Sequence, residues 1–129
     1  LASRIDAPKS LTTVFSKSPQ DGRPHVEIHG DEIWLVSAER GSVFSEKKTE
    51  SLDVLLYWLF RSITSQMAQE YELQHRNEQQ DPRRIMFSRQ MELMRGLSSS
   101  WHEILKGEVE NILSTNPYLD PPATTSLSV

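Results

Sequence analysis

The sequence predicts an α+β protein, in which a small N-terminal antiparallel sheet packs on a long central helix that is followed by two further helices. Apolar and polar residues alternate between about residues 25 and 46, and this period of two is typical of half-buried strands. Beyond residue 50 the apolar residues recur every three or four positions, which is the period of an amphipathic helix. Proline at positions 82 and 117 interrupts this second pattern, and proline ends helices.

The composition is that of a soluble protein with one core. The chain has 129 residues, of which 36% are hydrophobic and 25% are charged, and such a chain suits one domain. We expect a single domain over residues 1–120 and a disordered tail over residues 121–129. No run reaches the roughly 18 apolar residues of a membrane span. No stretch reads as a secretory signal, although the chain begins with Leu1, which is compatible with the removal of an upstream piece.

Charge and cysteine content narrow the function classes. The absence of cysteine excludes disulfides, cysteine nucleophiles and thiolate metal sites, and it is compatible with a reducing cytoplasm. The net charge of −4 disfavours non-specific binding of nucleic acid, which depends on neutralising phosphates. The same charge favours a basic partner. We therefore expect neither a nucleic-acid nor a membrane partner, and no cofactor.

The sheet is expected over about residues 11–48, and its first strand is a short one at 11–15. A loop rich in turn residues follows, and then three strands in the sequences HVEIH, EIWLVSAE and VFSE. Two turn signals separate these strands, Gly30-Asp31 and Arg40-Gly41-Ser42. Such pairs are typical of hairpins, and Gly41 suits a position with positive φ.

The long central helix is expected over about residues 50–80. Its N-cap is Thr49 or Ser51, because hydroxyl side chains accept the free amides of a helix start. Its main apolar face carries Leu52, Leu55, Leu56, Leu59, Phe60, Ile63, Met67 and Tyr71. A second apolar face in the first half, with Val54, Tyr57 and Trp58, indicates a helix that is covered on two sides.

Two shorter helices are expected over about residues 82–97 and 100–115. Asp81 suits the cap of the first, and Pro82 suits its first position. The run Ser98-Ser99-Ser100 is expected to cap the second helix, and Ser100 and Glu103 have the spacing of a capping box. The face of this helix expected to be buried carries Trp101, Ile104, Leu105, Glu108, Val109 and Ile112, with Glu108 at its edge.

Two clusters suggest chemistry, and each has a plainer explanation. His25 and His29 share a strand face with Glu27 between them, so a metal ion could bind there. We prefer a solvated outer face of the sheet, with Val26 and Ile28 turned inward, because no third ligand and no metal-binding motif is evident.

The second cluster is Glu72, His75 and Arg76, which lie one helical turn apart and could transfer protons. Asp81, Arg83 and Arg84 could complete such a site. We prefer an ion-pair and capping network between the two helices, because no Gly-rich loop, GxSxG or paired-carboxylate motif supports an enzyme. We expect no catalytic residue and no metal site.

Arginines at positions 83, 84, 89 and 95, followed by GLSSS, also permit a helix-turn-helix interpretation. The next helix would then contact DNA, yet WHEILKGEVENIL has one lysine and three glutamates, so phosphate would repel it. Acidic residues instead cluster at the strand turns and the start of the central helix, where they form either a surface for a basic partner or an ordinary solvated surface. They are Asp31, Glu32, Glu39, Glu46, Glu50 and Asp53.

Five stretches together resemble the immunity protein 63 family, whose members are bacterial proteins encoded beside polymorphic toxins. They are SAERG (37–41), LDVLLYWLF (52–60), YELQHR (71–76), DPRRIMFSRQMELM (81–94) and ILSTNPYLD (112–120). The most specific parts are ERG, LLYW, YE…R and D-x-RR-I-x-F. The resemblance covers about residues 24–120 and contains no catalytic motif. Its family-like positions are Glu39, Arg40, Gly41, Tyr57, Trp58, Tyr71, Glu72, Arg76, Asp81, Arg83, Arg84, Phe87, Pro117 and Asp120.

The resemblance implies a non-catalytic protein that binds a cognate toxin encoded by a neighbouring gene and occludes its active site, and a nuclease is one candidate for that toxin. The alternative is an enzyme that disarms the toxin or its product with Glu72, His75 and Arg76. The residues expected to bind the toxin are Asp31, Glu32, Glu46, Glu50, Asp53 and His75. Those expected to form a structural ion-pair network are Glu39, Arg40, Glu72, Arg76, Asp81, Arg83 and Arg84.

Overall fold

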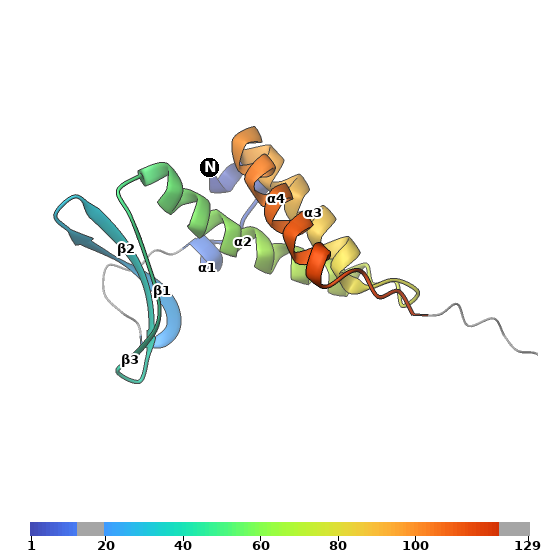
Figure 1. Cartoon of the computed structure of the whole chain (residues 1–129), viewed down its shortest axis with the longest axis horizontal. Helices are drawn as coiled ribbons and strands as arrows, with labels where there is room; N and C mark the ends of the chain where they lie inside the picture. The colour runs from blue at the N-terminus through green and yellow to red at the C-terminus, as the bar shows by residue number, and fades with distance from the viewer. Residues whose placement is uncertain (13–19, 122–129) are drawn as a thin grey trace, which may run out of the picture. The chain divides into compact units, whose positions relative to one another are not determined.

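The computed structural model describes residues 1–12 and 20–121 and has the expected α+β architecture (Figure 1). A three-stranded antiparallel sheet is followed by three long helices. The elements in chain order are η1 (Ala2–Ile5), α1 (Lys9–Thr12), β1 (Asp21–His29), β2 (Glu32–Glu39), β3 (Ser42–Thr49), α2 (Leu52–Gln74), α3 (Pro82–Leu97) and α4 (Ser99–Thr115). Within the described part of the chain, no helix is both long and apolar enough to cross a membrane.

The chain divides into two compact units, and the boundary falls inside α2. The sheet unit is Pro8–Phe60, and the helical unit is Leu1–Ala7 together with Arg61–Val129. In the sheet unit, the buried apolar side chains are Val36, Ala38, Leu55, Tyr57 and Phe60. The sheet and the first turns of α2 therefore belong to the same unit.

Both predicted hairpin turns are present, and the sheet order is β1-β2-β3. Gly30 has φ +64° in the turn between β1 and β2. Arg40 and Gly41 both have positive φ between β2 and β3, as a two-residue type I′ turn requires. Each connection leaves two residues between its strands, and this length pairs the neighbouring strands antiparallel.

The N-terminal edge of the sheet differs from the expectation. Leu11 belongs to the helical turn α1 rather than to a strand over 11–15, and its amide donates to the carbonyl of Pro8 at 3.0 Å. Residues 13–15 of that predicted strand lie outside the described residues. β1 begins at Asp21, and its register shifts between Asp21 and Pro24. Pro24 is compatible with this strand because β1 is at the edge of the sheet, where a missing N–H is tolerated.

Helix α2 begins as predicted but ends earlier. The hydroxyl of Ser51 accepts the amide of Val54 at 3.3 Å, so Ser51 rather than Thr49 caps the helix. The helix ends at Gln74 instead of about residue 80. The side chain of Asn77 accepts the amide of Gln79 at 2.9 Å, and such local turns of asparagine compete with helix formation.

In the helical unit, α3 and α4 lie side by side (Figure 1). Met94 of α3 has no exposed surface and packs in the core with Leu93, Leu97, Trp101, Leu105 and Val109. The N-terminal turn η1 joins this core, because Cγ2 of Ile5 lies 3.6 Å from the position that a Cβ atom would take at Gly96. Arg4 also donates to the carbonyl of Leu97 at 3.4 Å.

One polar contact in this core was not predicted. Thr64 of α2 is completely buried, and its hydroxyl accepts the side-chain amide of Gln90 at 3.3 Å. The same amide donates to the carbonyl of Arg61 at 3.0 Å. Buried polar groups need such partners, so this pair ties α2 to α3 at a defined register.

Two expectations for α4 need correction. Ser98, rather than Ser100, is the N-cap and accepts the amide of Trp101 at 3.2 Å. Ser98 has the extended backbone conformation of a cap, whereas Ser100 already lies inside the helix. Ile104 is 49% exposed and does not belong to the buried face.

Met94 and Ile104 form a matched pair for testing the core. Met94→Ala is expected to lower the free energy of unfolding by about 2–5 kcal/mol, because it removes a fully buried side chain and leaves a cavity. Ile104→Ala is expected to change it by about 0.5 kcal/mol or less. Urea denaturation of both variants measures the difference, and equal effects would contradict the described core.

Candidate functional site

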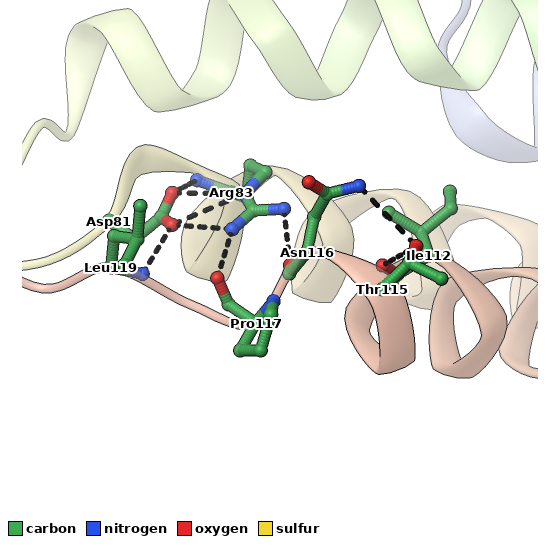
Figure 2. A pocket seen from close by; sticks show the side chains of 7 residues that line it. All are labelled: Asp81, Arg83, Ile112, Thr115, Asn116, Pro117 and Leu119. Atoms are coloured by element: carbon green, nitrogen blue, oxygen red, sulfur yellow. Dashed lines mark hydrogen bonds and ion pairs between the residues drawn. The ribbon is translucent and has the colours of Figure 1, made fainter.

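The described residues form a pocket of about 440 Å³ where α3 begins and α4 ends. It is lined by Asp81, Arg83, Ile112, Thr115, Asn116, Pro117 and Leu119 (Figure 2). Asp81 is the N-cap of α3 and accepts the backbone amide of Arg83 at 2.9 Å. The same carboxylate accepts the backbone amide of Leu119 at 2.9 Å. Asp81 therefore holds the segment after α4 against the start of α3.

Arg83 contacts both Asp81 and the segment after α4 (Figure 2). We call this arrangement, in which Asp81 and Arg83 hold residues 116–119, the clasp. The Nη2 of Arg83 donates to Asp81 at 2.8 Å and to the carbonyl of Pro117 at 2.8 Å. Its Nη1 donates to the carbonyl of Asn116, the C-cap of α4, also at 2.8 Å. A cation at a helix C-terminus satisfies carbonyls that lack a partner within the helix and interacts favourably with the helix dipole.

A second ion pair extends the clasp. Arg84 donates through Nε and Nη2 to the carboxylate of Asp120 at 2.9 Å. Asp120 also accepts the backbone amide of Asp81 at 2.8 Å. The guanidinium of Arg84 lies 4.2 Å from the ring centre of Tyr118, which is within cation–π distance. The segment from Asn116 to Asp120 is thus held by both arginines at the start of α3.

The electrostatics of the clasp follow from these contacts. The Arg83 guanidinium, followed by the Leu119 and Arg83 amides, holds the pKa of Asp81 far below its ordinary value. The side chain of Arg84, followed by the amide of Asp81, likewise lowers the pKa of Asp120. Both carboxylates are therefore ionised at neutral pH, and their oxygen atoms accept hydrogen bonds from groups of the same chain. The clasp therefore joins the start of α3 to the segment after α4 through ionised side chains.

The carboxylate of Glu72 and the imidazole of His75 make separate contacts. Glu72 is 2% exposed and accepts from Nε and Nη2 of Arg76 at 3.0 and 3.2 Å. His75 instead hydrogen-bonds through Nδ1 to the carbonyl of Tyr71 at 2.9 Å, and its ring stacks on the Tyr71 ring at 4.0 Å. The buried carboxylate is thus paired with arginine and not with the imidazole.

Within the helical unit, the residues expected in one ion-pair network form separate pairs. Glu72–Arg76 and Asp81–Arg83 are two distinct pairs, and Arg84 pairs with Asp120, which the sequence-based network did not include. Glu39 and Arg40 are exposed at the turn between β2 and β3. Among the described residues, no ion pair joins Glu39 and Arg40 to each other.

The acidic residues expected to bind a partner are all exposed and belong to the sheet unit. Asp31 and Glu32 are at the turn between β1 and β2, and Glu50 and Asp53 flank the start of α2. Glu46 lies within β3 and pairs with Lys48 at 3.3 Å. His75, the remaining residue of the set, belongs to the helical unit and is exposed.

The face of the sheet that carries His25, Glu27 and His29 differs from the expectation. His25 is only 5% exposed, whereas Ile28, which was expected to point inward, is 68% exposed. Both histidines hydrogen-bond through Nε2 to Glu27, at 2.6 Å for His25 and 2.8 Å for His29. These bonds lower the pKa of Glu27, and the bond to His29 has the larger effect.

Sequence reasoning placed these three residues on one face but missed the aromatic contact beside them. The ring of Trp34, opposite Glu27 in the ladder, lies 3.9 Å from the ring of His29. Nothing in the strand alternation shows which face is covered, and this explains the error. Among the described residues, no group of three or more acidic or histidine side chains is placed to hold a metal ion.

A comparison with models of known protein families shows which family the chain belongs to. The family model described as immunity protein 63 matches residues 30–111, which is more than half of the chain. The chain belongs to the immunity protein 63 family. No curated protein and no solved structure gives a significant match.

The matched range includes residues of both the sheet unit and the helical unit. It runs from Gly30, in the first hairpin turn, to Asn111 in α4, and so is shorter than the expected 24–120. It contains Glu72, Arg76 and the Asp81–Arg83 half of the clasp. Pro117 and Asp120, also expected to be family-like, lie beyond it. As a member of an immunity protein family, the chain has a toxin as its implied partner.

Arg83→Ala is expected to lower the melting temperature more than Arg84→Ala. The first change removes the guanidinium from the largely buried carboxylate of Asp81 and from two carbonyls at the end of α4, and groups left without partners in this way are costly. The second removes a more exposed pair, which contributes less. Thermal unfolding followed by circular dichroism provides the comparison, and equal shifts would contradict the role assigned to Arg83.

The clasp also predicts how stability depends on acid. Because the folded state lowers the pKa of Asp81, its ionised form stabilises the fold above the ordinary aspartate pKa of about 3.9. This contribution is lost as the pH falls below that value toward the folded pKa. Asp81→Asn should therefore flatten the decrease in unfolding free energy between about pH 4 and pH 2. Asp120→Asn should flatten it less, because fewer donors hold that carboxylate. Parallel curves for all three proteins would contradict this assignment.

Proposed function

We propose that this chain binds a cognate bacterial toxin and neutralises it by covering the active site, without chemistry of its own. The family match over residues 30–111 carries the proposal. We further propose that the toxin belongs to a polymorphic toxin system used in competition between bacteria, that a neighbouring gene encodes it, and that the two proteins meet in the bacterial cytoplasm.

The side-chain contacts support binding rather than catalysis. Glu72 is paired with Arg76, and the imidazole of His75 is bonded to a backbone carbonyl. The alternative, an enzyme that disarms the toxin with these residues, would need the imidazole to reach a reacting group together with the carboxylate. Occlusion needs only a surface that is complementary to the toxin.

The charge distribution supports a toxin with a basic substrate groove, such as a nuclease. The exposed acidic residues of the sheet unit lie at the turn between β1 and β2, in β3 and at the start of α2. Carboxylates can occupy the positions that nucleic-acid phosphates would take in such a groove. The choice of a nuclease is by analogy with the class of toxins, together with the net charge of −4.

A charge-reversal experiment tests this function. The triple variant Asp31→Lys, Glu32→Lys and Glu50→Lys is expected to bind the toxin encoded by the neighbouring gene about 10-fold or more weakly. It should also no longer protect cells that express the toxin. Calorimetry measures the affinity, and growth on co-expression measures protection.

Two controls make the result specific. The variant Glu70→Lys, Glu103→Lys and Glu110→Lys has the same net charge but changes exposed residues of the helical unit, and it should retain affinity. His75→Ala should lower protection only to the extent that it lowers affinity, because a residue that acts by occlusion acts through binding alone. Loss of protection by His75→Ala with unchanged affinity would instead indicate an enzyme, and no binding by the unmodified chain would refute the proposed function.

A further inference from the structure

We propose that the end of the sheet at the turn between β1 and β2 carries an apolar anchor site, which binds an apolar side chain of the toxin that is flanked by lysine or arginine. The site consists of Ile28, Ile33 and Leu52, which we call the apolar corner. This inference rests on the proposed function. It adds to the acidic residues of the sheet unit the contact that keeps the toxin bound after the two proteins have met.

The strand register brings the apolar corner together. Ile28 is directly opposite Ile33, and Ile33 is directly opposite Thr49, so these residues share one face of the sheet. The end of β1, the start of β2 and the end of β3 lie at the same end of the sheet, and α2 begins there with Leu52 (Figure 1). From the spacing of strands and of residues along a chain, the Cα atoms of Ile28 and Leu52 are roughly 20 Å apart or less. One protein–protein interface of ordinary size covers that distance.

The apolar corner is open to solvent, although its sequence has the pattern of a covered face. The alternation along β1 predicts that Val26 and Ile28 turn inward. Val26 is half-buried, as is Ile33, but Ile28 is 68% exposed and Leu52 is 62% exposed. Single exposed apolar residues are common on protein surfaces. Apolar residues that are exposed together mark binding surfaces, and the apolar corner is such a place.

Carboxylates flank the apolar corner and define its partner. Asp31 and Glu32 lie between Ile28 and Ile33 along the chain, and Glu50 lies just before α2. All three are exposed, and no ion pair joins them to another described residue of the sheet unit. An apolar centre with a polar rim is the usual composition of a protein–protein interface. Because this rim is acidic, it is complementary to an apolar side chain within a basic surface.

The same rim disfavours a second copy of this chain as the occupant. In a two-fold contact both copies present the same surface. Asp31, Glu32 and Glu50 of one copy would then meet the same three carboxylates of the other copy. Like charges brought together in an interface are costly, whereas lysine or arginine on the toxin would compensate each carboxylate.

The lysines of β3 already make contacts within their own chain. The ammonium group of Lys47 lies 5.6 Å from the ring centre of Trp58, and that of Lys48 lies over the ring of Trp34 at 4.0 Å. Lys48 also pairs with Glu46 at 3.3 Å. Using either lysine to neutralise the acidic rim of a second copy would cost these contacts.

Matched alanine variants test the apolar corner. Ile28→Ala and Leu52→Ala should each raise the rate of dissociation from the toxin encoded by the neighbouring gene at least about 10-fold. The association rate should stay within about 2-fold, because an apolar contact acts after the two proteins have met. Ile104→Ala and Leu73→Ala remove the same side chains from exposed positions of the helical unit and should keep both rates. Surface plasmon resonance measures the rates.

Two further variants separate the apolar contact from folding and from charge. Ile28→Thr keeps the β-branched shape that strands favour but makes the side chain more polar, so it should also dissociate faster. Thermal unfolding checks that each variant is folded. The charge-reversal variant of Asp31, Glu32 and Glu50 should instead lower the association rate and its dependence on salt.

The outcomes separate this proposal from the proposed function. Unchanged dissociation of Ile28→Ala, Ile28→Thr and Leu52→Ala, with tight binding by the unmodified chain, would overturn the apolar anchor and leave the proposed function standing. Equal weakening by the two control variants would overturn it as well. A chain that dimerises in sedimentation velocity, and becomes monomeric with Leu52→Ala, would show a second copy at the apolar corner and overturn the choice of the toxin. Absence of any complex would refute the proposed function itself, and the anchor with it.

Discussion

The arrangement of α3 and α4 in the helical unit depends on the ion pair between Asp81 and Arg83. One residue caps the start of α3, and the other satisfies carbonyls at the end of α4, while the two side chains bind each other. Neither side chain can fill its role alone, because the Asp81 carboxylate would then be largely buried without its cation. This ion pair therefore positions the two helix ends, and it holds the segment after α4 together with the Arg84–Asp120 pair.

Several parts of this arrangement could be predicted because they depend on local chemistry. Gly30 and Gly41 mark the hairpin turns through their positive φ, and Asp81 followed by Pro82 marks the start of α3. The other half of the clasp consists of the Asn116 and Pro117 carbonyls and the Leu119 amide. Backbone atoms have no residue-specific signature, so no sequence pattern identifies these partners.

The errors have equally specific causes. Three successive serines, Ser98 to Ser100, lie around the start of α4 and have the same side chain, so the extended backbone conformation of Ser98 distinguishes it as the cap. Asn77 forms a local turn within a run of good helix formers and replaces the last helical turns expected there. Alternation along β1 correctly groups His25 with Glu27, yet it does not show that His25 is buried. Burial depends on tertiary contacts, which a period of two does not record.

The placement of the two lysines of β3 has an optical consequence. The indoles of Trp34 and Trp58 each lie beneath a lysine ammonium group from this strand, whereas Trp101 is buried in the helical unit. Tryptophan emission responds to nearby charge and to exposure. The chain thus carries two native fluorophores that report on the surroundings of β3 and a third that reports on the integrity of the helical core, so single-tryptophan variants can follow the two units separately without an added label.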